Sequence, residues 1–389
     1  MGACASVCSS DSSEGVKQHN VGHNIRNFTN TMHVTEPALA DLYRGVKKLG
    51  EGSAAEVWLC RSLRAGEPDV ALKLFRRPFQ EAPQSSLSRE IQVPMDLSEG
   101  CVSMIDAYDA YLTPQHLVLS LEPVLGGNLK AYLDVKASKA SNGYVMDEDE
   151  ARYFFQQIVL SLVHLHEHSW THRDVKLSNV LLTKSDPHEV RFCDFGFAKP
   201  LDDPAGRQLA TTHLGTYEYM SPELLENAAA GQQSPYDPRA VDVWSSGVML
   251  TMLLFGSKPF NHNRAADAGY SAAEEALWKV ETSRPWYEAD LLKGAAATIS
   301  PEGKDLLDRI FTIDPVRRIS MREVQQHPWL QKPLSSKYQR VASSLASRQA
   351  QLEQTVGLHT ADAGKVAARR SQLEDLVMQA CASQGQKGL

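Results

Sequence analysis

The sequence predicts an α+β protein in which a small β-rich lobe is followed by a larger α-rich lobe. Three observations lead to this prediction. Between residues 43 and 124, short apolar runs are separated by turn residues, as strands usually are. After residue 128 the apolar residues recur at helical spacing. Residues 241–256 are apolar nearly all round, which is typical of a helix buried at the centre of a lobe.

The elements of the β-rich part follow in chain order. Residues 46–60 hold two apolar stretches on either side of a glycine-containing turn, and we expect two strands there. Further strands are expected at residues 69–75 and 116–124. Between these strands, residues 86–97 have a helical pattern.

The elements of the second part are mainly helices. Residues 148–168 predict a long amphipathic helix with acidic residues in its first turn, where the helix dipole favours them. Short strands are expected at residues 179–183 and 190–196. Residues 300–311 and 320–330 predict two further helices, each with a serine near its start.

The composition excludes several classes of protein. The 389 residues are 42% hydrophobic, which is too apolar for a mainly disordered chain. The net charge is -7, so the chain lacks the excess of basic residues that is typical of a nucleic-acid-binding protein. We therefore expect no nucleic-acid partner. Six cysteines are too few for a disulfide scaffold. The first 30 residues contain no apolar secretory segment, and the longest apolar run, residues 247–256, is too short to span a bilayer. We therefore expect an intracellular protein.

The two ends of the chain differ from its middle. Residues 1–42 are polar and show neither the helical nor the strand periodicity of apolar residues, and they predict a flexible arm. Residues 331–389 carry eight Lys or Arg against four Asp or Glu, and their apolar residues predict two amphipathic helices around residues 357–364. Two interpretations of these helices remain open. They dock on the preceding domain or fray, or they bind a partner or inhibit the domain.

A glycine-containing turn and a lysine give the first indication of phosphate chemistry. Gly50 and Gly52 lie between two predicted strands, and glycines let backbone amides approach phosphate oxygens because no β-carbon intervenes. Alone, this pattern also fits a hairpin that binds nothing. However, Lys73 follows in the next predicted strand, and Glu90 lies in the helical stretch beyond it. A pair of these two side chains would fix the ammonium group for a phosphate.

The strongest pattern lies in residues 172–182. Asp174, Lys176 and Asn179 crowd one short loop after a long predicted helix, and Asp194 begins an Asp-Phe-Gly turn further on. Two carboxylates and an amide suit Mg²⁺, which prefers oxygen ligands. Each piece alone fits an ordinary polar loop, but the ordered set favours a site for a nucleotide and its metal ion.

Taken together, these motifs make the chain resemble a eukaryotic protein kinase over residues 43–330. The signatures occur in the family's order: the glycine-rich loop, Val-Ala-Leu-Lys at 70–73, Glu90, His-Arg-Asp at 172–174, Asp-Phe-Gly at 194–196 and Ser-Pro-Glu at 221–223 in place of Ala-Pro-Glu. Further matches are Asp242, Trp244 and Gly247 in the buried helix and residues 314–320, where the resemblance pairs Arg318 with Glu223.

The resemblance implies a two-lobed protein kinase fold, with ATP and Mg²⁺ as cofactors. The implied nucleotide-binding residues are Leu49, Gly50, Glu51, Gly52, Ser53, Val57, Ala71, Lys73, Glu122 and Val124, with Leu121 at the back of the adenine pocket. Asn179 and Asp194 would bind the metal ion. The implied catalytic residues are Asp174, which orients the substrate hydroxyl, Lys176, which steadies the phosphoryl group, and Lys73 with its partner Glu90.

The chain departs from the family pattern at three further positions and at residues 98–102, which lack the usual His-Pro-Asn-type turn. Ala55 replaces the third glycine of the loop, and Asn128 replaces an acid that often contacts ribose. Pro94 falls four residues after Glu90, where the helix is expected to continue. A proline inside a helix removes a hydrogen bond and kinks or ends the helix, so we expect a short or mobile helix here.

Two features bear on substrate class and activation. Lys176 and the segment at residues 215–223 resemble the serine/threonine branch of the family. In the family, an arginine such as Arg173 often pairs with a phosphorylated residue of the activation loop. Thr212 has the usual spacing before Gly215 and Thr216, so we expect a phosphorylation site there, with an unmodified threonine as the alternative.

The N-terminus carries a second pattern. Gly2 with Ser6 fits N-myristoylation after removal of the initiator methionine. Cys4 and Cys8 are candidate sites for S-palmitoylation. One myristoyl chain binds a membrane only marginally, with an association constant of about 10⁴ M⁻¹. The first 25 residues contain a single lysine and no arginine, so we expect an acyl chain rather than charge to be the second signal.

The sequence therefore predicts three segments: an acylated arm at 1–42, a protein kinase domain at 43–330 and a basic, partly helical tail at 331–389. The expected function is transfer of the γ-phosphoryl group of Mg-ATP to Ser or Thr hydroxyls of protein substrates. The protein is expected at the cytoplasmic face of a membrane through its lipids, or in the cytoplasm if it is not acylated. Two alternatives remain: a membrane-tethered pseudokinase scaffold and a small-molecule phosphotransferase with the kinase fold.

Overall fold

The chain forms two compact units in a computed structural model of its 389 residues. The structure describes residues 39–52, 54–77, 84–139, 145–201, 217–230, 236–260, 285–288, 292, 294, 297–359 and 363–382. Unit 1 is built from the described residues within Met1–Ala131, Leu181–Gly196 and Gln349–Leu389. Unit 2 is built from those within Tyr132–Val180 and Phe197–Arg348.

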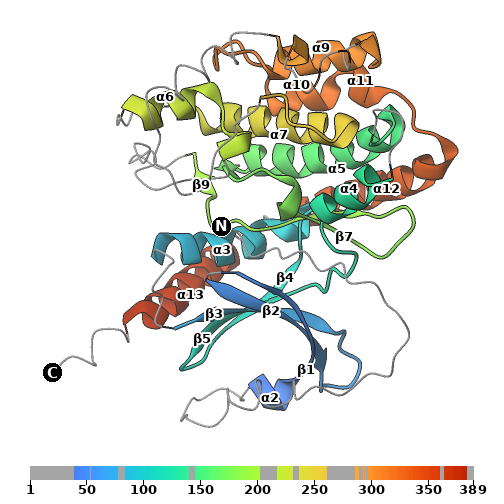
Figure 1. Ribbon diagram of the computed structural model, residues 1–389. Helices are drawn as coiled ribbons and strands as arrows, with labels where there is room; N and C mark the ends of the chain where they lie inside the picture. The colour runs from blue at the N-terminus through green and yellow to red at the C-terminus, as the bar shows by residue number, and fades with distance from the viewer. Residues whose placement is uncertain are drawn as a thin grey trace. The chain divides into compact units, whose positions relative to one another are not determined.

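Unit 1 contains a five-stranded antiparallel sheet (Figure 1). In sheet order its strands are β1 (Tyr43–Glu51), β2 (Ala55–Ser62), β3 (Val70–Arg76), β5 (His116–Leu121) and β4 (Ala107–Leu112). β3 is the middle strand, and six of its seven residues are buried. Lys73 is one of them, opposite Val57 on one side and Leu119 on the other. The sheet therefore holds a lysine in its interior, where an unpaired charge would be costly.

The short helix α2 (Leu39–Leu42) packs against the sheet. Leu39 and Leu42 are buried in one apolar cluster with Trp58, Leu72 and Val118. Leu39 and Leu42, which precede the expected kinase domain, therefore pack in the core of the sheet.

Helix α3 (Gln84–Leu97) is followed by the 3-10 turn η1 (Ser98–Gly100). The helix continues three residues past Pro94, so the expectation of a helix cut short at this proline is wrong. Val93, Pro94 and Met95 are all buried. Packing of these apolar side chains offsets the one backbone hydrogen bond that a proline cannot donate.

Both helices expected in the tail are present, as α12 (Ser336–His359) and α13 (Ala363–Ala382). α12 ends at His359 and α13 begins at Ala363, so the two helices are separated within the expected residues 357–364. α13 lies alongside α3 (Figure 1). Leu373, Val377 and Ala380 recur at helical spacing on α13 and are buried, so one face of this helix packs against the rest of unit 1.

A two-stranded sheet leads into the Asp-Phe-Gly turn. Its strands are β7 (Val180–Leu182) and β8 (Val190–Phe192). In unit 1, the backbone N–H of Phe192 donates to the carbonyl of Ser103 at 2.7 Å, and its carbonyl accepts from Ile105 at 3.0 Å. These bonds fix the chain two residues before Asp194.

The second half of the chain is mainly helical. Its elements are α4 (Leu129–Ala137), α5 (Glu148–Glu167), β6 (Trp170–Thr171), η2 (Leu177–Asn179), β9 (Lys199–Pro200), η3 (Tyr217–Tyr219), α6 (Pro222–Ala230), α7 (Pro238–Phe255), η4 (Trp286–Glu288), α9 (Pro301–Ile310), α10 (Met321–Gln326) and α11 (Pro328–Gln331). Every residue of α7 from Ala240 to Phe255 is buried, as its all-round apolar sequence predicts. A β-carbon at Gly247 would collide with the side chain of Ile310, so the glycine lets α9 approach α7 closely.

Side-chain caps fix the starts of the helices in unit 2. Asp147 accepts a hydrogen bond from the backbone at the start of α5, and Asp237 does the same for α7. The two predicted serine starts are confirmed, because Ser300 caps α9 and Ser320 caps α10 in a capping box with Glu323. The α+β organisation predicted from the sequence is confirmed. Among the described residues, no helix is both long and apolar enough to cross a bilayer.

Candidate active site

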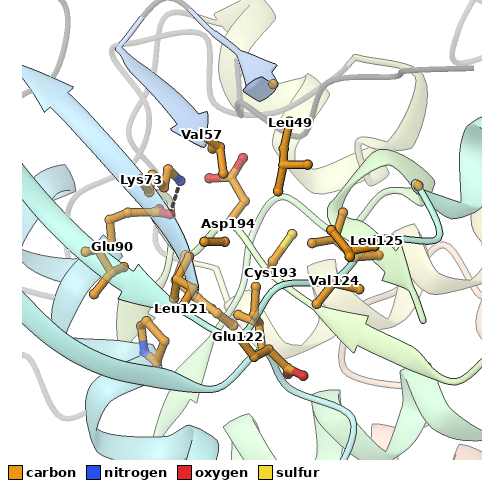
Figure 2. A pocket seen from close by; sticks show the side chains of 18 of the residues that line it. Leu49, Val57, Lys73, Glu90, Leu121, Glu122, Val124, Leu125, Cys193 and Asp194 are labelled. Atoms are coloured by element: carbon orange, nitrogen blue, oxygen red, sulfur yellow. Dashed lines mark hydrogen bonds and ion pairs between the residues drawn. The ribbon is translucent and has the colours of Figure 1, made fainter. Parts of the chain in front are cut away.

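Unit 1 contains a pocket lined by strands of the sheet and by the segment that follows β5 (Figure 2). Seven of the predicted nucleotide-binding residues line it: Leu49, Gly50, Val57, Ala71, Lys73, Glu122 and Val124. Leu121, which was expected at the back of the pocket, also lines it. The predicted Glu51 and Gly52 lie at the end of β1 and are not in the lining. Ser53 lies outside the described residues.

The two sides of the pocket differ in chemistry. Figure 2 shows the side chains of Lys73 and Glu90 at one side and those of Leu49, Val124 and Leu125 at the other. A ligand with an apolar ring and an anionic part fits such a pocket, because the ring is desolvated by the apolar wall while the anion meets the ammonium group.

The buried ion pair of Lys73 and Glu90 is the pocket's main charged feature. The Nζ atom of Lys73 donates to Oε1 of Glu90, and both side chains are buried. Burial raises the pKa of Glu90 to about 7; Lys73 opposes this rise, and nearby Asp194 adds to it. Glu90 thus holds the Lys73 ammonium group in one position at the pocket wall.

Asp194 lies in the pocket wall beside this ion pair (Figure 2). Its backbone has a φ of 70°, which non-glycine residues adopt rarely. The carbonyl oxygen of Gly196 accepts hydrogen bonds from Oγ of Ser86 at 3.0 Å and from Nε of Arg89 at 3.2 Å. The turn is therefore held by helix α3, a connection that the sequence motifs did not indicate.

The segment after β5 is held by a residue that sequence reasoning also missed. Nε of Arg191 donates to Oε1 of Glu122 at 2.8 Å, and the backbone N–H of Asp106 donates to the same oxygen at 3.0 Å. Asn128, expected as a departure at a ribose contact, is buried, and its Oδ1 accepts from the backbone of Ala131 at 2.9 Å. Asn128 thus caps helix α4. The Arg191 contact is not visible in a motif because it joins residues far apart in the chain, whereas the Asn128 cap is a local contact.

The predicted catalytic residues of unit 2 lie together in one loop. Nζ of Lys176 donates to Oδ2 of Asp174 at 2.6 Å. The side-chain nitrogen of Asn179 donates to the backbone carbonyl of Asp174 at 2.8 Å and to its Oδ2 at 3.1 Å. All three side chains are buried, so the Asp174 carboxylate is held by two donors.

The catalytic loop is anchored to helix α7 through Asp242. The carboxylate of Asp242 accepts hydrogen bonds from the backbone N–H groups of His172 and Arg173 at 2.9 and 2.8 Å. The ring Nε2 of His166 lies 2.9 Å from the same carboxylate. These contacts support the left-handed backbone of Arg173, whose φ is 60°.

Two nitrogen atoms of the Arg173 side chain differ in their hydrogen bonding. Its Nε donates to the carbonyl of Phe197 at 2.8 Å. Its buried Nη1 has no hydrogen-bond acceptor within the part of the chain that the structure describes. The predicted phosphorylation site Thr212 and the predicted lipidation sites Gly2, Cys4 and Cys8 lie outside the described residues.

The pairing of Arg318 with Glu223, which the resemblance implied, is present. Two nitrogens of the guanidinium group donate to the two carboxylate oxygens at 2.8 and 2.9 Å. This ion pair ties the start of α6 to the segment between α9 and α10 within unit 2.

Comparisons with known proteins agree with this geometry. A family model described as the protein kinase domain matches residues 43–330. The chain is 32% identical over 292 residues to serine/threonine-protein kinase SAPK9 of Oryza sativa subsp. japonica, covering 75% of this chain and 72% of the relative. It is 32% identical over 295 residues to serine/threonine-protein kinase SRK2E of Arabidopsis thaliana, covering 76% and 73%. It is also 32% identical over 294 residues to serine/threonine-protein kinase SRK2A of Physcomitrium patens, covering 76% and 75%.

Proposed function

This chain belongs to the protein kinase family and is a serine/threonine kinase that uses ATP on protein substrates; from that premise we propose how it binds ATP, transfers the phosphoryl group and reaches a membrane. The proposed organisation is an acylated arm at residues 1–42, a catalytic domain at 43–330 and a basic tail at 331–389.

The single observation that carries the proposed mechanism is the Lys73–Glu90 ion pair beside Asp194 in the pocket of unit 1. A protein that does not transfer phosphoryl groups has no functional reason to retain a buried lysine paired with a glutamate. With Asp174 and Asn179 also present, this observation disfavours the pseudokinase alternative.

The pocket of unit 1 is the proposed ATP site. Val57, Ala71 and Leu121 would contact the adenine ring, and the backbone from Glu122 to Val124 would hydrogen-bond its polar edge. Lys73 would hold the α- and β-phosphates, because a buried ammonium group fixed by a carboxylate needs no reordering when the phosphates arrive.

Asp194 and Asn179 have the chemistry to hold Mg²⁺. Asp194 offers carboxylate oxygens and Asn179 an amide oxygen, and both are hard ligands of the kind Mg²⁺ prefers. The amide nitrogen of Asn179 is engaged by Asp174, which leaves the oxygen as its metal ligand. When bound, the ion would neutralise charge on the phosphates during transfer.

Asp174 is the proposed residue that receives the substrate. Its carboxylate would accept a hydrogen bond from the Ser or Thr hydroxyl and take the proton as the oxygen attacks the γ-phosphorus, while the bond from that phosphorus to the β–γ bridging oxygen breaks and ADP leaves. Lys176, 2.6 Å from Oδ2 of Asp174, would stabilise the negative charge of the moving phosphoryl group. Most of the catalysis would then be positioning and charge stabilisation.

Phosphorylation of Thr212 is the proposed activation step. The buried Nη1 of Arg173 supports this proposal, because a guanidinium nitrogen without an acceptor in the described fold is suited to an anion. A phosphate adds a charge of about -1.5 to -2 and three acceptor oxygens.

The proposed membrane anchor is myristate on Gly2 with palmitate on Cys4 or Cys8. The support is the sequence pattern: a second glycine, a serine four residues later, and two nearby cysteines. Two chains make anchoring stable where one chain is marginal.

The mechanism is tested by incubating the protein with radiolabelled ATP, Mg²⁺ and generic Ser/Thr peptides. Wild-type protein is expected to label the peptides, and Asp194→Asn is expected to lose most of this labelling. Equal labelling by the two proteins would contradict the proposed metal site.

A further inference from the structure

Helix α3 contacts the Asp-Phe-Gly turn at more than one position. Besides Glu90, two side chains of the helix, Ser86 and Arg89, donate hydrogen bonds to the carbonyl oxygen of Gly196, at 3.0 and 3.2 Å. Ser86, Arg89 and Glu90 are spaced as residues i, i+3 and i+4, so they lie on one face of the helix. This face of the helix therefore contacts the Asp-Phe-Gly turn through three side chains.

The approach of α3 to Gly196 is close. A β-carbon at this position would lie 3.0 Å from Oγ of Ser86 and 3.1 Å from Oε2 of Glu90. Both distances are shorter than about nine in ten of the contacts that real β-carbons make. A side chain at residue 196 would push away either the donor of the hydrogen bond or the partner of Lys73. The glycine thus lets α3 and the turn meet.

The two hydrogen bonds act on a strained segment. Asp194, two residues before Gly196, has its backbone in the left-handed region. Such a conformation persists only where surrounding contacts over-determine it. A carbonyl oxygen has two lone pairs, so Ser86 and Arg89 together satisfy the acceptor of Gly196. The backbone that carries the Asp194 carboxylate is therefore tied to α3 on its C-terminal side and to Ser103 and Ile105, through Phe192, on its N-terminal side.

We propose that Ser86 and Arg89 are positioning residues that hold the Asp194 carboxylate in place by anchoring the carbonyl of Gly196. Helix α3 then controls two parts of the site: it fixes Lys73 through Glu90, and it fixes Asp194 through Gly196. This role presupposes the proposed assignment of Asp194 to the metal ion. Loss of the two donors is expected to weaken metal-dependent binding and turnover while binding of the metal-free nucleotide is retained.

The test uses full-length protein with Ser86→Ala, Arg89→Ala and the double substitution. Ser86→Thr and Arg89→Lys are the conservative variants, because each retains a donor. Ser85→Ala is the matched control, since Ser85 is the exposed neighbour on the same helix. The melting temperature is measured without nucleotide, with ADP and a chelator, and with ADP and Mg²⁺. Turnover of a generic Ser/Thr peptide is measured beside it.

The double substitution is expected to keep the stabilisation by ADP alone and to lose most of the additional stabilisation by Mg²⁺. Its kcat is expected to fall about tenfold and its KM for Mg-ATP to rise, because the two lost hydrogen bonds position the proposed metal ligand Asp194. Ser86→Thr is expected to keep the Mg²⁺-dependent stabilisation and the kcat of wild type. Ser85→Ala is expected to match wild type as well.

Two results would overturn the proposal. One is a double variant with wild-type Mg²⁺-dependent stabilisation and kcat. The other is a double variant whose stability without nucleotide and with ADP alone falls as much as its response to Mg²⁺, because that pattern marks a merely structural role. Asp194→Asn is run in parallel. If it keeps the full Mg²⁺ response, the metal assignment fails, and that failure is distinct from a failure of the Ser86 and Arg89 role.

Discussion

Arg318 and Glu223, 95 residues apart in the chain, form a two-point ion pair in the interior of unit 2. The side chain of Arg318 is 0% exposed and that of Glu223 is 12% exposed. The same guanidinium group also donates to the carbonyls of Thr312, Ile313 and Ala240. All of the N–H donors of this guanidinium group point at fixed acceptors. The planar guanidinium of arginine can satisfy this geometry, and the ammonium group of a lysine cannot.

Arg318→Met is expected to lower the free energy of unfolding by about 3–5 kcal/mol, because it leaves Glu223 buried without its partner. Arg317→Met is the matched control. The Arg317 side chain is 83% exposed, and its nearest carboxylate oxygen, on Asp314, lies at 3.5 Å. An exposed pair of this kind contributes less than about 1 kcal/mol. Urea denaturation followed by circular dichroism measures both values, and equal midpoints for the two variants would contradict the prediction.

The buried Glu90 makes stability depend on pH. Its pKa is raised in the folded protein to about 7 from an ordinary value near 4.5, chiefly by burial. Between these two pH values the folded protein binds more protons than the unfolded chain, so the free energy of unfolding falls as pH rises through this window. Glu90→Gln removes this titration.

We therefore expect the stability of wild-type protein to decline relative to Glu90→Gln from about pH 4.5 to about pH 7 and to run parallel outside that range. Denaturation in urea at a series of pH values measures the difference. Curves that stay parallel across the whole range would show that Glu90 titrates alike in the folded and unfolded states.

Asp174→Asn is expected to lower kcat by orders of magnitude, because an amide cannot take the proton of the substrate hydroxyl. Binding of ADP should stay near the wild-type value, since Asp174 does not line the pocket of unit 1. Peptide phosphorylation and the shift of melting temperature by ADP separate the two effects. Asp134→Asn, at an exposed position, should behave as wild type in both assays. Undiminished turnover in Asp174→Asn would refute its assigned role.

The docked tail helix α13 is expected to contribute to the stability of unit 1. Leu373 and Val377 are buried on the face that packs on α3, and Nε2 of Gln92 on α3 donates to Oε1 of Glu374 at 3.2 Å. Replacing Leu373 and Val377 by Ala should lower the free energy of unfolding by about 2–5 kcal/mol. Met378→Ala, where the side chain is 57% exposed, is the control and should change it by less than about 1 kcal/mol. If the double variant were as stable as the control, the docking of α13 would not be significant in solution.

The sequence predicted the parts of the fold and site that depend on local pattern. The hydrophobic spacing predicted the buried helix α7, and Ser300 and Ser320 marked the starts of α9 and α10 because a hydroxyl there caps the backbone. Lys73 and Glu90 were paired by their place in an ordered set of motifs, and the pair is present.

Most of the remaining features depend on contacts between distant residues. A local rule treats Pro94 as a helix breaker, but burial of that turn of α3 outweighs the missing hydrogen bond. Asn128 was noted only as a replacement of an acid that often contacts ribose; its cap on α4 is a local contact, of a kind that an Asn just before a helix favours. Nothing near Ser86 or Arg191 in the chain indicates that the first meets Gly196 and the second meets Glu122, because each contact spans more than 65 residues of sequence.

The proposed membrane anchor predicts where the protein is found in cells. Gly2→Ala removes the only amine that can be myristoylated, and without that chain the protein should not stay at membranes long enough to meet palmitoyl transferases. Both lipids should then be lost together, and each buried CH₂ group is worth about 0.8 kcal/mol of membrane affinity.

Gly2→Ala should therefore move the protein from the membrane pellet to the soluble fraction after cell fractionation. Kinase activity should be retained, because residue 2 lies far in sequence from the first residue that lines the pocket, Lys47. Replacing Cys4 and Cys8 by Ser while keeping Gly2 should give only partial release, since one chain remains. Immunoblotting of the two fractions measures the distribution. A Gly2→Ala protein that still pellets quantitatively would show that another feature holds it at the membrane, and the basic residues of the tail at 331–389 would be the next to replace.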